Sequence, residues 1–140
     1  MAIKRVDHVA VVVADLDDAL RVYRDALGME LAQVETIVEQ DVKVGFLPSG
    51  GTELELLEPI HPESGIGQFL ARRGEGMHHI CFEVDDLDAT LAELKAKGTR
   101  LIDETPKEGA HGKVAFIHPK GAHGVLIELL EVARTEGEPV

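Results

Sequence analysis

The sequence predicts an α+β fold, a single domain of 140 residues built from two paired βαβββ modules. An internal repeat is the first observation behind this prediction: Asp7–Asp17 matches His78–Asp88 at an offset of 71 residues. The second is that each copy has an apolar run of strand length, then a helical spacing of apolar residues, then shorter extended segments. We place the first module at residues 3–58, a linker at 59–76, the second module at 77–131 and a tail at 132–140.

The first module begins with a β-branched run, Val6–Val13, which has the length and composition of a buried strand. Asp15 can then cap a helix over Leu16–Leu27, because its side chain can accept a hydrogen bond from a free backbone N–H of the first turn. Gly28 stands where a left-handed residue ends a helix. Three extended segments are expected to follow, at residues 30–37, 42–47 and 53–57.

The second module repeats this layout. Asp86 is its cap and Gly98 its helix stop, with an apolar stripe between them. Its extended segments are expected at residues 100–104, 113–117 and 125–130. Within the linker, Ile66–Arg72 can form a short helix. The later repeats match at offsets of 70 and 73 residues, so loop lengths differ slightly between the copies.

Composition limits the function. A chain with 44% apolar and 29% charged residues is typical of globular proteins. Its net charge of −12 argues against a nucleic-acid partner, which would need clustered Lys and Arg. No apolar run approaches the roughly 20 residues of a membrane helix, so no membrane partner is expected. The chain enters a strand pattern directly, without a signal region, and a cytoplasmic location is the default expectation.

The repeat places one His and one Glu at matching positions of each module. His8 and His79 lie on the first strands, and Glu55 and Glu128 interrupt the apolar last strands. Carboxylates inside apolar strands are costly unless a cation compensates them. The four residues therefore form a candidate site for a divalent metal, with Zn²⁺, Mn²⁺, Co²⁺ and Ni²⁺ all compatible with His and carboxylate ligands.

Other residues compete less well for this role. Glu53 shares the strand face of Glu55 and is its rival, but Glu55 is the residue that matches Glu128 in the repeat. His78 has the opposite strand parity from His79 and is expected to be exposed. Cys81 lies in an apolar strand, where a free Cys is usually a small core residue. The histidines of the loops and turns are also expected to be exposed: His61, His111, His118 and His123.

Several segments resemble the vicinal oxygen chelate superfamily and, within it, the methylmalonyl-CoA epimerase family. They are Asp7–Ala10, Phe46–Pro48, Thr52–Pro59, Gly76–Val84, Gly109–Lys113, His118–Lys120 and Gly124–Leu129. The resemblance covers residues 3–131 and implies the glyoxalase or vicinal oxygen chelate fold, in which paired βαβββ modules form a curved sheet with a cleft. It also implies a divalent metal, most often Co²⁺ or Mn²⁺, held by His8, Glu55, His79 and Glu128.

The activity implied by the resemblance is interconversion of (R)- and (S)-methylmalonyl-CoA by 1,1-proton transfer at C2, through a metal-stabilised enolate. Two acid/base groups must then flank C2. By resemblance, one is a Glu in the first module, which we map to Glu39 with Glu35 as its neighbouring rival, and the other is Glu128. A homodimer is implied in the same way.

Three alternatives share the fold. A glutathione-dependent lyase of the glyoxalase I type would differ only in the distal pocket. A metal-free small-molecule binding or resistance protein would have no need for four symmetric ligands. An Fe(II) extradiol dioxygenase usually needs two His and one carboxylate, so a fourth candidate ligand counts against it.

Overall fold

The computed structural model describes residues 3–133, which form two compact units. We call residues 8–79 the N-terminal unit, and residues 3–7 with 80–133 the C-terminal unit. The division cuts through two strands, β1 (Ile3–Val12) and β5 (Gly76–Val84), so each unit contains part of both. The part of the predicted tail at residues 134–140 lies outside the described residues.

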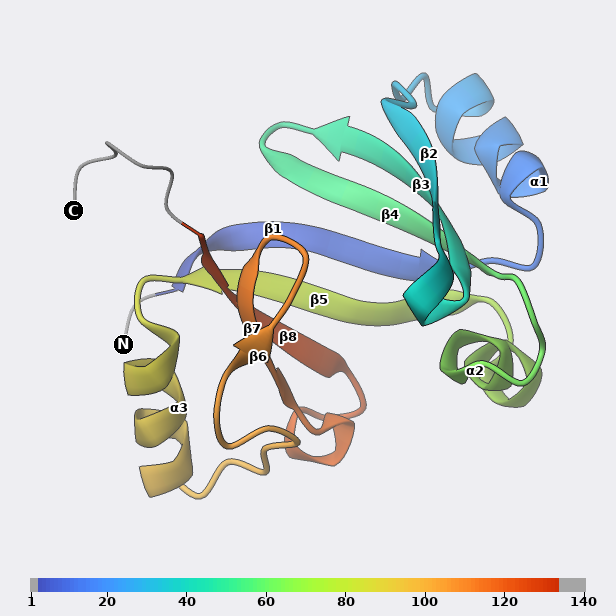
Figure 1. Ribbon diagram of the computed structural model, residues 1–140. Helices are drawn as coiled ribbons and strands as arrows, with labels where there is room; N and C mark the ends of the chain where they lie inside the picture. The colour runs from blue at the N-terminus through green and yellow to red at the C-terminus, as the bar shows by residue number, and fades with distance from the viewer. Residues whose placement is uncertain (1–2, 134–140) are drawn as a thin grey trace. The chain divides into compact units, whose positions relative to one another are not determined.

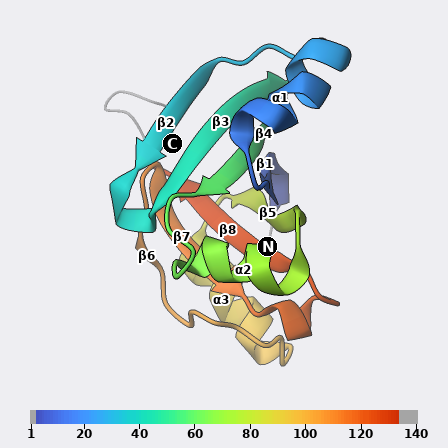
Figure 2. The same ribbon diagram turned by 90° about the vertical axis from the view of Figure 1, so that its right-hand side faces the viewer.

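The N-terminal unit is a mixed sheet with two helical segments beside it (Figure 2). Its order is β2-β3-β4-β1, where β2 and β4 each pair with β3 in antiparallel orientation and β1 pairs with β4 in parallel. The remaining elements are β2 (Gln33–Ile37), β3 (Val42–Ser49), β4 (Thr52–Pro59), the helix α1 (Leu16–Leu20), its π-helical continuation η1 (Arg21–Ala26), the 3₁₀ turn η2 (Val38–Gln40) and α2 (Gly65–Arg73).

The C-terminal unit has the strand order β5-β8-β7-β6, and α3 lies beside its strands (Figure 1). β7 pairs with β6 and with β8 in antiparallel orientation. Its elements are α3 (Leu87–Ala96), β6 (Lys107–Glu108), β7 (Gly112–Ile117), the 3₁₀ turn η3 (Pro119–Gly121) and β8 (Leu126–Val132). The predicted α+β class and βαβββ order of each module are confirmed. None of the helices described over residues 3–133 is long and apolar enough to cross a membrane.

Each unit buries apolar side chains on both faces of its sheet. In the N-terminal unit, α1 covers a cluster around Leu47 and Leu56, while Phe69 and Leu70 of α2 pack on a second cluster around Val12. In the C-terminal unit, α3 covers a cluster around Leu129. The second cluster there is smaller and consists of Cys81, Val114 and Leu130. Cys81 is 0% exposed, which confirms it as a core residue.

Both long helices are anchored at their first turn by the same pair of contacts. The side chains of Asp15 and Asp86 accept hydrogen bonds from Asp18 N–H and Ala89 N–H, as predicted for N-caps. A second carboxylate, at the end of each module's last strand, also accepts a helix N–H: Leu16 N–H donates to Glu58 at 2.7 Å, and Leu87 N–H donates to Glu131 at 2.9 Å. Helix and last strand are thereby tied together in each unit.

The π-helix η1 accounts for a shift in the repeat. The cap residues Asp15 and Asp86 match at an offset of 71, whereas the helix stops Gly28 and Gly98 match at 70, so the first helix contains one residue more. Leu27 N–H donates to the carbonyl of Val22, five residues earlier, as in a π-turn. The extra residue is absorbed inside the helix. Both stop glycines have a positive φ, 76° and 78°, as predicted.

One extended segment was predicted wrongly. Residues 100–104 form no strand; Leu101 makes only an isolated bridge with Ile117, and the second strand of the module, β6, comes later at residues 107–108. The side chain of Asp103 accepts a hydrogen bond from Phe116 N–H at 2.9 Å, so a side chain takes the place of a ladder carbonyl. Pro106 follows and has no N–H to donate. The predicted linker helix is confirmed as α2.

Candidate metal centre

Two imidazoles meet inside the N-terminal unit. His8 on β1 and His79 on β5 bring their Nε2 atoms to 3.1 Å, and the side chain of His8 is only 12% exposed. Two nitrogens that each bind one ion at about 2.0–2.1 Å, with an angle of about 90–110° between them, lie about 2.9–3.4 Å apart. The observed separation therefore fits a pair of ligands to one divalent ion.

His78 supports the second imidazole. Its Nδ1 lies 2.9 Å from Nδ1 of His79, and its ring meets the edge of Phe69 on α2, with centroids 4.9 Å apart. Burial, then the nearby His79 and Arg73, lower the pKa of His78 from 6.5 to about 4. A neutral His78 can accept the Nδ1–H of His79, and this leaves Nε2 of His79 with a lone pair for an ion.

The expectation that His78 is exposed is therefore wrong. Its strand parity does differ from that of His79, but Phe69 of α2 packs against the ring, which is partly buried. The adjacent pair His78-His79 was the available signal in the sequence, since metal-binding imidazoles are commonly held by a hydrogen bond at their other nitrogen.

Glu55 approaches the first imidazole from β4. Its Oε2 lies 3.5 Å from Nδ1 of His8, and the carboxylate is 17% exposed. β1 and β4 are parallel, with Ala10 opposite Glu55, so both side chains emerge on the same face as His8. The contact is to the ring nitrogen away from His79. Glu55 can thus orient His8.

Glu128 belongs to the C-terminal unit. It lies on β8 opposite Phe116 of β7, just as Glu55 lies opposite Phe46 of β3 in the N-terminal unit. Glu128 is partly buried and shares its face of β8 with Leu130, a member of the small core cluster. On the same unit, Lys107 Nζ lies 5.0 Å from the centroid of Phe116 and 3.5 Å from Asp103. The equivalent of Lys107 by strand register is Glu35, because Lys107 pairs with Val114 as Glu35 pairs with Val44.

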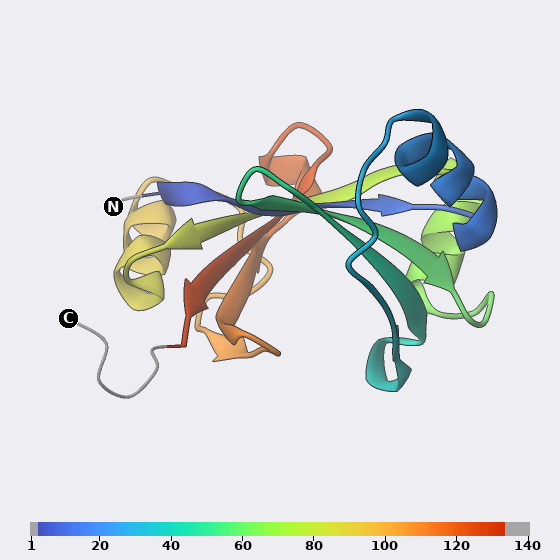
Figure 3. The ribbon, with the colours of Figure 1, turned by 90° about the horizontal axis from the view of Figure 1, so that it is seen from above.

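Glu39 is in the 3₁₀ turn η2, at the end of the β2–β3 hairpin (Figure 3). Its side chain is exposed, as is that of its rival Glu35 on β2. Among the histidines expected to be exposed, His61, His111 and His123 are exposed and His118 is partly buried. His118 accepts a hydrogen bond from Lys120 N–H, so it caps the η3 turn.

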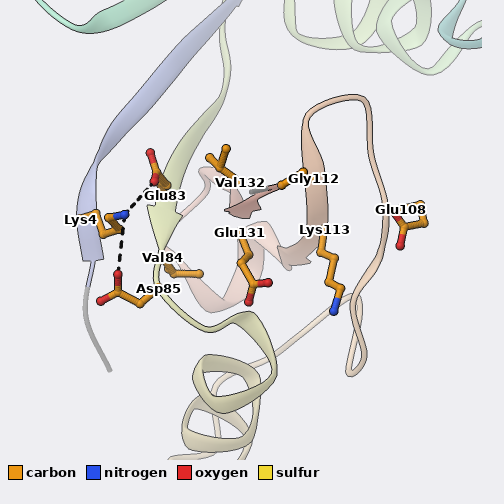
Figure 4. A pocket seen from close by; sticks show the side chains of 10 residues that line it. Lys4, Glu83, Val84, Asp85, Glu108, Gly112, Lys113, Glu131 and Val132 are labelled. Carbon is orange, nitrogen blue, oxygen red and sulfur yellow. Dashed lines mark ion pairs between the residues drawn. The ribbon is translucent and has the colours of Figure 1, made fainter. Parts of the chain in front are cut away.

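A separate cleft of about 470 Å³ opens in the C-terminal unit (Figure 4). Lys4 lies there between Glu83 at 3.2 Å and Asp85 at 3.8 Å, and Lys113 and Glu131 also line the cleft. None of the lining residues is a predicted ligand or acid/base residue. The chemistry predicted from the sequence lies elsewhere.

The chain resembles proteins of one family. Residues 7–116 match the family model of the Glyoxalase/Bleomycin resistance protein/Dioxygenase superfamily. Mouse mitochondrial methylmalonyl-CoA epimerase is 46% identical over 127 residues, which cover 89% of this chain and 71% of the mouse protein. The chain belongs to this superfamily, in the methylmalonyl-CoA epimerase family.

Other members of the epimerase family agree along nearly their whole length. An ethylmalonyl-CoA/methylmalonyl-CoA epimerase of Cereibacter sphaeroides is 42% identical over 133 residues, covering 93% of this chain and 99% of that protein. The crystal structure of the methylmalonyl-CoA epimerase from Mycobacterium tuberculosis has a TM-score of 0.81 at 40% identity, covering 94% and 90%. The predicted vicinal oxygen chelate fold and the enzyme class are thereby confirmed.

Proposed function

We propose that this enzyme interconverts the C2 epimers of methylmalonyl-CoA by 1,1-proton transfer. The observation that carries the proposal is the pair of partly buried imidazoles, His8 and His79, with Nε2 atoms 3.1 Å apart in a chain of the epimerase family. An epimerase of the same fold has been solved with methylmalonyl-CoA and NH₄⁺, with a TM-score of 0.80 and 38% identity.

The ligand set that we propose is His8, Glu55, His79 and Glu128. The approach of the two imidazoles supports His8 and His79, and the sequence repeat and the family resemblance support Glu55 and Glu128. Co²⁺ or Mn²⁺ is expected, and Zn²⁺ or Ni²⁺ suits the same ligands. A bound divalent ion supplies the positive charge that stabilises an enolate oxygen.

The side chains would divide the proton transfer between them. The hydrogen at C2 lies between a thioester and a carboxylate, and inversion requires removal of the proton on one face and delivery on the other. We assign Glu39 to one face and Glu128 to the other. Glu128 would then have two roles, ion binding and proton transfer, whereas the exposed Glu39 has only the second.

Deuterium uptake at C2 in D₂O tests the proposal. Metal-loaded protein should introduce one deuterium into methylmalonyl-CoA and convert a single epimer into a mixture, as measured by mass spectrometry and NMR. Chelator-treated protein should exchange no faster than buffer alone, and the ion should restore exchange. Metal-loaded protein that exchanges at the buffer rate would refute the proposal.

A parallel assay distinguishes the proposed epimerase from a glutathione-dependent lyase. The protein is given the hemithioacetal of methylglyoxal and glutathione, and product formation is compared with turnover of methylmalonyl-CoA. Faster conversion of the glutathione adduct would identify a lyase of the glyoxalase I type. Ethylmalonyl-CoA, which the name of the Cereibacter relative includes, extends the test to acyl chain length.

Two further properties follow from the resemblance and from composition. We propose that the enzyme is a homodimer in the cytoplasm, with no nucleic-acid or membrane partner, in keeping with its net charge of −12. Light scattering after size-exclusion chromatography should give twice the chain mass of 15.2 kDa. Cell fractionation should recover the protein with the cytoplasmic markers.

A further inference from the structure

Asp41, the residue after η2, is held at three points of the N-terminal unit. Its backbone is left-handed, with φ 55° and ψ 44°, and its N–H donates to the carbonyl of Val38, closing the η2 turn. Its own carbonyl accepts a hydrogen bond from Ile60 N–H at 3.0 Å. Its carboxylate accepts one from Nδ1 of His61 at 2.6 Å. The turn that carries Glu39 therefore ends at a fixed residue.

His61 is in turn fixed to the start of α2. Its carbonyl accepts hydrogen bonds from Ser64 N–H at 3.3 Å and from Ser64 Oγ at 3.0 Å, and Ser64 caps α2 by accepting from Gly67 N–H. A Cβ at Gly67 would come within 2.6 Å of the carbonyl oxygen of His61, so only glycine allows this close approach. Because α2 is itself packed on the core cluster around Val12, the segment that contains His61 is attached to a well-packed helix.

The C-terminal unit contains the same backbone contact. By the repeat, His111 matches Asp41 and Ala133 matches Ile60, and Ala133 N–H donates to the carbonyl of His111 at 3.1 Å. The β2–β3 connection has four residues between Ile37 and its partner Val42, whereas the second module has two between Gly109 and Gly112, so no residue there matches Glu39. The backbone bond is thus a property of the fold, whereas Asp41 and its imidazole partner occur beside the turn that carries the carboxylate.

We propose that His61 is a positioning residue that, through Asp41, holds the η2 turn so that Glu39 is presented to the substrate. This rests on the proposed function, because it takes Glu39 as one of the two acid/base groups. The two residues are 20 positions apart in the chain, and their contact joins the turn that carries Glu39 to the segment that caps α2. Loosening the turn by about 1 Å is enough to slow a reaction up to about 100-fold.

The charge of the pair depends on pH. The hydrogen bond with Asp41, its charge and the nearby Glu63 raise the pKa of His61 above its ordinary value of 6.5. The charged pair is therefore present at neutral pH and is lost as pH rises through this raised pKa. A neutral imidazole still donates Nδ1–H to the carboxylate, so the turn is loosened rather than released.

The test compares His61→Ala and Asp41→Asn with wild type in the metal-loaded enzyme. We expect kcat to fall about 10- to 100-fold with KM, metal content and unfolding midpoint unchanged. The kcat profile of wild type should decline as pH rises above the pKa of His61, and this step should vanish in His61→Ala. His123→Asn, which removes an exposed imidazole from the other unit, is the matched control and should behave as wild type.

A double-mutant cycle shows whether the effect acts through Glu39. If it does, His61→Ala adds nothing to the loss already caused by Glu39→Gln. Independent, multiplying losses would overturn the proposal, and so would a His61→Ala enzyme with wild-type kcat while Glu39→Gln is impaired. Full turnover by Glu39→Gln would instead overturn the role of Glu39 in the proposed function, so the two failures are distinguishable.

Discussion

The N-terminal and C-terminal units anchor their helices in the same way, with Leu16 N–H on Glu58 and Leu87 N–H on Glu131. They differ in what surrounds the sheet. In the N-terminal unit, α2 packs on the face that carries His8, whereas the matching cluster around Cys81 is small. The comparison teaches that the repeat supplies a common scaffold, and that both imidazoles of the close pair, His8 and His79, lie in one unit.

The largest expected effect, on metal affinity and turnover, comes from removing one imidazole of the N-terminal unit. We expect His79→Ala to lower metal affinity more than about 100-fold, and turnover with it, because it removes a proposed ligand. His78→Phe keeps the ring packed on Phe69 but removes the acceptor for His79, so we expect a loss of about 10- to 100-fold. Isothermal titration with Co²⁺ measures both. Equal losses would show that His78 is itself a ligand.

The two proposed acid/base groups can be separated by isotope exchange. In Glu39→Gln we expect epimerisation to fall about 10²- to 10⁴-fold, while metal content stays at the wild-type level. One of the two epimers should still exchange its C2 hydrogen with D₂O, because in the proposed mechanism its proton is removed by Glu128. Glu128→Gln should lose metal as well. If Glu39→Gln epimerises normally, Glu35→Gln becomes the variant to measure.

The internal repeat predicted the order of elements well because capping and periodicity are local. Asp15, Asp86, Gly28 and Gly98 act within one turn of each helix, so the sequence alone was enough to place them. The two wrong predictions, the exposure of His78 and the position of β6, have a different origin. The exposure of His78 depends on α2, and the position of β6 depends on the side chain of Asp103, neither of which a strand pattern contains.

The candidate site was predicted in a similar, partial way. His8 and His79 were paired by the repeat, and the structure brings their Nε2 atoms together. That Glu55 approaches Nδ1 of His8 rather than the face toward His79 could not be predicted, because it depends on the relative positions of β1 and β4. The sequence repeat matches Glu58 with Glu131, but their contacts with the helix N–H groups could be recognised only in the folded structure.

The extra residue of the first helix should be removable. Deleting Asp25 makes the first helix the same length as α3, and we expect the π-helix to become regular, with a change in unfolding free energy within about 1 kcal/mol. Deleting Ala92 from α3 instead rotates Leu94 by about 100° out of its cluster, at a cost of about 2–5 kcal/mol. Urea denaturation measures the unfolding free energy of both variants. Equal losses would mean that the π-helix η1 does not accommodate an inserted residue.

The smallest effect, and the most symmetric, is expected at the two strand-end carboxylates. Glu58→Ala and Glu131→Ala each leave one helix N–H without its acceptor, which costs about 1–2 kcal/mol. Because the contacts are alike, the two costs should agree within about 0.5 kcal/mol. Guanidinium denaturation of the metal-free variants is the measurement. A much larger cost in one unit would show that the two anchors have diverged.

The division of β1 and β5 between the units has a consequence for how such a chain can be cut. Each unit contains a strand segment from the opposite repeat, and the His8–His79 pair takes one imidazole from each repeat within a single unit. Neither repeat alone can therefore complete a unit. Cleavage in the linker should yield two fragments that are individually unable to bind metal and that recover binding only when mixed, so the continuous chain acts as a covalently joined pair of interdependent halves.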